Sequence, residues 1–173
     1  MNSNIALIAF IQIASSLSTG IVILWITYRG FQRFGDKYFG MRAENNMAYS
    51  ILMATVLFSI GYSVSSVIQP LVSAFRLMNE SSNSAFELAG TFFVQGGLYI
   101  AITYIVSILI TFVGVAIYTY LTPLNEFEEI QKNNIGVAIV LSVIVITLNM
   151  MSRSGVALLI ESIIPYPTLP PAF

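Results

Sequence analysis

The sequence contains no cysteine and no histidine. The lack of cysteine excludes disulfide bonds, iron–sulfur clusters and zinc sites built from thiolates. The lack of histidine excludes histidine-ligated haem, the usual copper and catalytic zinc sites, and the most common general base. The chain also shows no nucleophile–base pair, no phosphate-binding glycine loop and no pair of intramembrane carboxylates. We therefore expect neither a metal nor a cofactor, and we do not expect an enzyme.

Charge is also scarce, because 9% of the residues are charged, whereas soluble domains carry about 25%. Hydrophobic residues make up 57% of the chain. Such a chain cannot cover a soluble surface, so the lipid bilayer is its expected environment. The net charge of −1 gives no electrostatic basis for binding nucleic acid.

Four long apolar segments predict four transmembrane helices, since about 20 helical residues cross the hydrocarbon core. The segments are Ile5 to Tyr28, Met47 to Phe75, about Gly90 to Leu121, and Ile135 to Ser152, the last continuing beyond Arg153 to Ile160. No Lys or Arg precedes the first segment, so we expect a retained helix rather than a cleaved signal peptide. Because the apolar runs are continuous rather than alternating, a β-barrel is excluded. The predicted fold class is all-α, in an integral membrane protein.

Two similar stretches, 88 residues apart, indicate an internal repeat. Each places a pair of asparagines, Asn45-Asn46 and Asn133-Asn134, between a short charged loop and a long apolar run. The same offset aligns Phe39 with Phe127. We interpret the chain as two parallel copies of one transmembrane hairpin. The predicted units are residues 1–78 (first hairpin), 79–87 (outer loop), 88–164 (second hairpin) and 165–173 (proline-rich extracytoplasmic tail).

Basic residues concentrate in the loop between the first and second predicted helices. They are Arg29, Arg33, Lys37 and Arg42. The positive-inside rule places this loop in the cytoplasm. Four crossings then put both termini outside the cytoplasm, and the third loop is cytoplasmic by the count of crossings.

The third loop carries a family resemblance. Residues 122–134 read Thr-Pro-Leu-Asn-Glu-Phe-Glu-Glu-Ile-Gln-Lys-Asn-Asn, and the small residues Gly136 and Ala138 follow. This stretch resembles the domain-of-unknown-function family DUF350, whose members are small bacterial inner-membrane proteins built from two such hairpins. In the first hairpin, Gly35-Asp36-Lys37-Tyr38 replaces the Thr-Pro-x-Asn-Glu pattern. The resemblance implies a four-helix layout and a place in the inner membrane, but it implies no activity.

The asparagine pairs have two interpretations. Asn is a preferred N-cap residue, and a helix that enters lipid leaves unpaired N–H groups without one. Alternatively, Asn45, Asn46, Asn133 and Asn134 meet at the pseudo-twofold axis and form a polar gate or a docking surface. The neighbouring loop would add the acidic residues Glu126, Glu128 and Glu129 to that surface.

Each predicted helix also carries a polar stripe at helical spacing. The stripes include Ser59, Ser63 and Ser66 in the second helix, Gln95 in the third and Asn149 in the fourth. They serve either close helix packing or a water-filled path between helices or subunits. Arg153 lies near the outer boundary, where it either snorkels to the headgroups near Glu161 or Glu87, or faces the outer mouth of such a path.

Two functions are compatible with these patterns. The first is an oligomeric structural or interaction component of the bacterial envelope that docks a cytoplasmic protein partner on its loops. The alternative is a homo-oligomeric ion channel or small-solute transporter lined by the Ser/Thr stripes. We expect a homo-oligomer in both cases, because self-association would bury the stripes.

Overall fold

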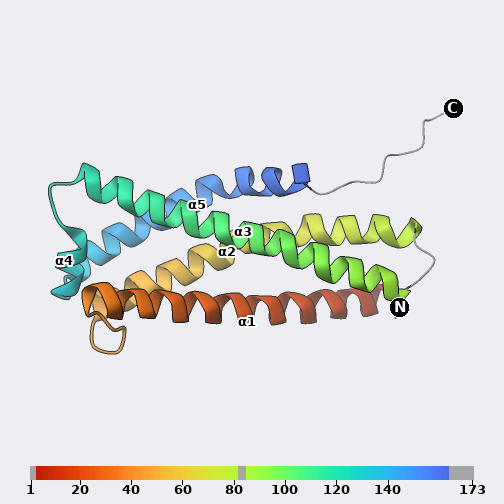
Figure 1. The fold of residues 1–173 in the computed structure, drawn as a ribbon, viewed down its shortest axis with the longest axis horizontal. Coiled ribbons are helices and arrows are strands. Elements are labelled where there is room, and N and C mark those ends of the chain that lie inside the picture. The colour runs from red at the N-terminus through yellow and green to blue at the C-terminus, as the bar shows by residue number, and fades with distance from the viewer. Residues whose placement is uncertain (1–2, 82–84, 164–173) are drawn as a thin grey trace.

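The computed structural model describes residues 3–81 and 85–163, and this part of the chain forms five helices without any strand (Figure 1). The helices are α1 (Ser3–Phe39), α2 (Met47–Ser81), α3 (Ala85–Leu121), α4 (Glu126–Gln131) and α5 (Ile135–Ile163). The all-α prediction is therefore confirmed. The predicted tail 165–173 lies outside the described residues.

Three of these helices contain segments that are long and apolar enough to cross a membrane. The segments are Met47–Ile68, Gly96–Leu121 and Ile135–Ile163. By length and composition they indicate a membrane protein, and they correspond to three of the four predicted spans. The first predicted span, Ile5 to Tyr28, falls within α1, and the side chains of residues 5–12 lie outside the described part. The fourth crossing therefore stays a prediction.

Helix α2 lies at the centre of the bundle. It packs most extensively against α5, and also against α3 and α1. Helix α3 packs against α5 as well, so α2, α3 and α5 form a three-helix core, while α1 runs along one edge (Figure 1). The second helices of the two predicted hairpins thus meet in the middle, but α1 and α3 have different surroundings. The predicted parallel repeat is neither confirmed nor contradicted by this arrangement.

Two residues with positive φ end helices at the same end of the bundle. Gly40 follows α1 with a φ of 63°, and Asn133 follows α4 with a φ of 64°. Asn133 donates its N–H to Ile130 O at 2.9 Å, and Asn134 donates to Glu129 O at 2.9 Å. These two bonds form a Schellman motif, in which Gly or Asn supplies the left-handed residue. The motif turns the chain directly from α4 into α5.

Candidate functional site

Hydrogen bonds converge at one end of the bundle, which we call the α4 end. It comprises the C-terminus of α1, the loop 40–46, helix α4 and the first turns of α2 and α5 (Figure 1). Asn46 is buried there and is the N-cap residue of α2, because its Oδ1 accepts from Tyr49 N at 2.8 Å. Its Nδ2 donates to Ile130 O at 2.7 Å. One side chain therefore starts α2 and also pairs with a carbonyl of the last turn of α4.

The second asparagine pair completes this connection. Asn133 accepts from Ala48 N of α2 at 3.0 Å through its Oδ1. The Oδ1 of Asn134 accepts from Val137 N at 3.4 Å, so Asn134 is the N-cap residue of α5. Three of the four predicted asparagines therefore come together at the α4 end and cap α2 and α5. Asn45 is exposed, and only its backbone N–H is bonded, to Arg42 O, within the described residues.

Aromatic and amide contacts attach α4 to α1. Phe39 and Phe127, which the repeat offset aligns, stack with their ring centroids 4.9 Å apart and their planes 10° apart. Gln131 Nε2 donates to Phe39 O at 2.8 Å. These contacts satisfy a carbonyl at the end of α1 and hold α4 across it. The α4 end is therefore a single interlocked unit rather than a set of independent loops.

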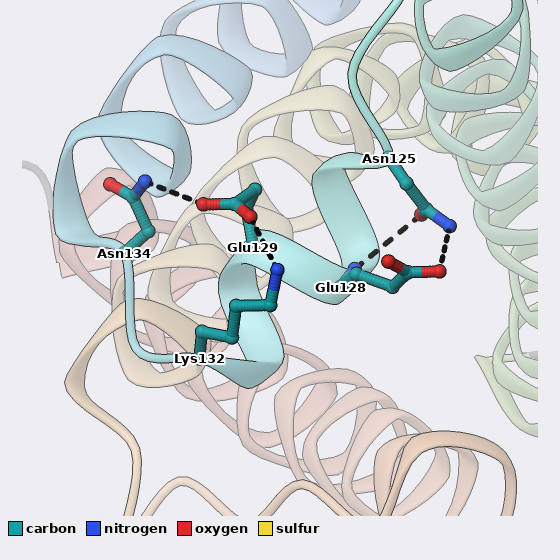
Figure 2. Close-up of polar contacts among 5 residues, drawn as sticks. All are labelled: Asn125, Glu128, Glu129, Lys132 and Asn134. Carbon is teal, nitrogen blue, oxygen red and sulfur yellow. Dashed lines mark hydrogen bonds and ion pairs between the residues drawn. The ribbon is translucent and has the colours of Figure 1, made fainter.

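The three glutamates predicted as a docking surface differ in accessibility. Glu128 is exposed and bonds to Asn125, the N-cap residue of α4, which donates to Glu128 Oε1 at 2.7 Å. Glu129 is half-buried and accepts from Lys132 at 2.8 Å and from Asn134 at 2.9 Å. Figure 2 shows these two groups of contacts on different sides of α4. They leave Glu128 as the most accessible of the three.

Glu126 is only 3% exposed, so a protein partner cannot reach it. The Thr122 hydroxyl donates to one of its carboxylate oxygens. The other, Oε2, has no hydrogen-bond partner among the described residues. Of the three glutamates predicted for the docking surface, Glu128 and Glu129 are therefore accessible and Glu126 is not.

Two ion pairs at the α4 end lower the pKa values of their own carboxyl groups. Hydrogen bonding from Lys132, and then from Asn134, lowers the pKa of Glu129 below its ordinary value. Arg42 donates two hydrogen bonds of 3.0 Å to Asp36, and this bonding lowers the pKa of that carboxyl. Exposed pairs of this kind contribute little to stability. Among the described residues, no three acidic side chains are placed to hold a metal ion.

The polar stripes of α2, α3 and α5 have members that meet inside the three-helix core. The buried members are Thr55, Ser59 and Ser63 of α2, Thr103, Ser107 and Thr111 of α3, and Ser142 and Asn149 of α5. Asn149, 1% exposed, donates to Thr111 Oγ1 at 3.1 Å and to Val145 O at 3.0 Å. Its Oδ1 accepts from Ser63 at 3.4 Å. One amide therefore joins all three helices, a role that polar side chains often have inside membranes.

Self-association was expected because it would bury the stripes, but these eight members are already buried within one chain. The homo-oligomer stays a prediction. Ser66 is half-buried and bonds to Ser63 O of its own helix at 2.6 Å, whereas the side chain of Gln95 lies outside the described part. Within that part, the hydroxyls of Ser59 and Ser142 are buried without a partner.

Arg153 is turned towards α2. Its Nη1 donates to the Tyr62 hydroxyl at 2.9 Å, and its guanidinium lies 4.3 Å from the centroid of the Tyr62 ring. The described ion pairs are Arg42–Asp36 and Lys132–Glu129, so the expected pairing with exposed Glu161 is not formed. The side chain of Glu87, the other expected partner, lies outside the described residues. A cation–π contact and a hydrogen bond thus hold Arg153 at the α2–α5 interface.

Helix α4 and Tyr62 were not predicted. The spacing Asn125-x-x-Glu128 is a capping pattern that could have indicated α4. No sequence pattern pointed to Tyr62, because its contact with Arg153 joins residues 91 positions apart on two helices.

Residues 92–164 match the model of the family described as Domain of Unknown Function (DUF350). The match covers most of α3 and all of α4 and α5, and it confirms the family resemblance seen in the third loop. No curated protein and no solved structure matches the chain significantly.

Proposed function

We propose that this protein, whose second hairpin matches the DUF350 family, is a structural and interaction component of the bacterial envelope. It spans the inner membrane with four helices and docks a protein partner on its α4 end. The observation that carries the proposal is the interlocking of that end. Asn46 and Asn133 form hydrogen bonds between the two predicted hairpins. Such bonds give a loop region the fixed shape that a docking surface needs.

The charge distribution supports a cytoplasmic location for the α4 end. Arg29, Arg33 and Lys37 are exposed on the part of α1 that leads into this end. An excess of Lys and Arg near the ends of transmembrane helices marks the cytoplasmic side. With four crossings, both termini would then be extracytoplasmic.

The accessible side chains of α4 and the loop before it form the proposed docking surface. It combines an exposed apolar group, Leu124 at 57% exposure, with the exposed polar groups of Asn125, Glu128 and Lys132. An apolar contact surrounded by charges is the usual composition of a transient interface. Glu128 favours a partner that presents a basic residue at this position.

The test exchanges one exposed acid for a base. Affinity-tagged wild type and Glu128→Lys would be purified with their partners from native membranes and compared by quantitative mass spectrometry. Glu44→Lys is the matched control, because Glu44 is also exposed at the α4 end but lies outside α4. We expect the same proteins to copurify with wild type and with Glu44→Lys, and to be depleted in Glu128→Lys. Identical recovery from all three would contradict docking on α4.

A second candidate function, a homo-oligomeric channel, is favoured by the buried hydroxyls of Ser59 and Ser142, which have no hydrogen-bond partner among the described residues. Buried polar groups nearly always have a partner, and water or an ion in the core would supply one. Ion flux into liposomes that contain the purified protein tests this candidate. Flux that Ser142→Val abolishes would favour the channel over the docking function.

A further inference from the structure

A basic hollow lies on the face of α1 that points away from the bundle. Arg29 and Arg33 are exposed and one helical turn apart, so they lie on the same face of the helix. Trp25 is one turn further along this face and is 59% exposed. Together with Ile26 and Gly30, these residues line a depression of about 460 Å³. Gly30 leaves its floor open, since no atom lies within 4 Å of the position that a Cβ would occupy.

The contacts between α1 and α2 place this hollow at the boundary of the membrane. The Tyr49 hydroxyl donates to Phe31 O at 2.6 Å, and the two rings stack with centroids 5.3 Å apart. Tyr49 is close to the first residue of the membrane span Met47–Ile68. Arg29 and Arg33, on either side of Phe31, therefore lie level with the end of that span. This is the depth at which lipid headgroups lie and at which Trp side chains are enriched.

The two arginines have no acidic partner within residues 3–81 and 85–163. The ion pairs of that part of the chain use Arg42 and Lys132. The Arg29 guanidinium instead lies 5.5 Å from the centroid of the Trp25 ring. This contact orients the cation on the rim of the hollow. Two guanidinium groups on one face provide the paired donors that recognise phosphate.

We propose that this hollow binds the phosphate of an anionic phospholipid in the leaflet at the α4 end. Arg29 and Arg33 hold the phosphate, while Trp25 and Ile26 contact the glycerol and the first carbons of the acyl chains. The occupant is a lipid because the hollow faces away from the bundle at headgroup depth and combines two cations with the apolar side chains of Trp25 and Ile26. Binding of this lipid does not depend on the docking function.

The fluorescence of Trp25 reports on the hollow directly, because the chain contains one tryptophan. The protein would be reconstituted in phosphatidylcholine bilayers that contain a small fraction of either brominated phosphatidylglycerol or brominated phosphatidylcholine. Bromine quenches a tryptophan that it contacts. We expect brominated phosphatidylglycerol to quench Trp25 at a concentration at least about five-fold lower, which is the effect of one cation near an anionic headgroup. The preference should decline as salt is added.

Substitutions separate a specific site from general attraction. Arg29→Gln with Arg33→Gln removes both phosphate donors and should abolish the preference, while circular dichroism shows that the helices are retained. Lys132→Gln removes a cation at the same end, one that is paired with Glu129, and should leave the preference unchanged. Equal quenching by the two brominated lipids, or a preference that persists in the double variant, would overturn the proposal. Loss of quenching on adding inorganic phosphate at constant ionic strength would assign the hollow to a soluble phosphate instead.

Discussion

Both polar atoms of the Asn46 side-chain amide form hydrogen bonds. Its Oδ1 caps α2, and its Nδ2 pairs with Ile130 O of α4. An isolated N-cap contributes about 1 kcal/mol. Removal of Asn46 also removes one of the two donors to Ile130 O, and the N–H of Asn133 remains. The same side chain therefore caps α2 and joins the two predicted hairpins.

The first prediction compares the two neighbouring asparagines. Asn46→Ala should lower the free energy of unfolding by about 2 kcal/mol, as the sum of a lost cap and a lost buried hydrogen bond to Ile130 O. Asn45→Ala, at an exposed position, should change it by less than about 0.5 kcal/mol. Thermal unfolding in detergent micelles measures both. Equal destabilisation by the two substitutions would show that the bonds of Asn46 are not needed.

The second prediction concerns the pKa of Glu129, which Lys132 and Asn134 lower from an ordinary value of 4.5. A carboxyl whose pKa is lower in the folded state stabilises the fold above that ordinary value. The contribution is lost as the pH falls through the lowered pKa. Lys132→Met should raise the pKa of Glu129 part of the way back, since Asn134 still donates to it. NMR titration of the side-chain carboxyl carbon measures this, and an unchanged pKa in the variant would contradict the assignment.

The contact between α1 and α2 depends on a glycine. A Cβ at Gly35 would collide with the Tyr49 side chain, which is 2% exposed and is held by its hydrogen bond to Phe31 O. Gly20, in the same helix, has open space at the corresponding position. Both glycines are in α1, so the pair isolates the effect of packing from that of helix propensity.

Gly35→Ala is therefore expected to destabilise the protein by about 1–3 kcal/mol through overpacking. Gly20→Ala should be neutral or stabilise it by up to about 1 kcal/mol, because alanine favours the helix. Denaturant titration in detergent micelles gives both values. If Gly35→Ala is as stable as Gly20→Ala, the close approach of α1 to α2 is wrong.

The three core helices are joined by a buried amide. Asn149→Ala should cost about 1–3 kcal/mol, from lost hydrogen bonds of about 0.6 kcal/mol each inside membranes and from the cavity left behind. Thr147→Ala is the control, since this exposed hydroxyl bonds only to Val143 O of its own helix among the described residues. Unfolding by sodium dodecyl sulfate in mixed micelles distinguishes the two. A Thr147→Ala variant as unstable as Asn149→Ala would remove the special role of the amide.

At the level of the whole molecule, long apolar runs were sufficient to predict an all-α membrane protein. Such runs have one stable solution in lipid, because every backbone polar group must be paired within the helix. The pairing of the helices could not be predicted, because a polar stripe has the same spacing whether it faces a pore or a neighbouring helix. The spacing of Asn149 and Ser63 fits either case. Only the hydrogen bond between them, which joins α5 to α2, shows that these stripes face neighbouring helices.

The loop that contains Glu126, Glu128 and Glu129 shows a second limit. Charge and position in the sequence predicted three accessible acids. The short helix α4 then gave them three different environments, because residues at successive positions of a helix point in different directions. The burial of Glu126 beside Thr122 follows from the turn before α4, which the sequence indicates only through its capping pattern.

The central claim is that the polar core is closed within each chain and that the protein acts through its α4 end. Thiol accessibility tests it directly, because the chain has no cysteine of its own. Ser63→Cys and Ser107→Cys place a thiol at positions that are 2% and 0% exposed, and Glu128→Cys places one on α4. We predict that a charged, membrane-impermeant thiol reagent labels the cysteine at position 128 in inside-out membrane vesicles, which expose the cytoplasmic face. It should label the other two only after denaturation. Labelling of the cysteine at position 63 at a rate similar to that at position 128 would reveal a water-filled path and contradict the account.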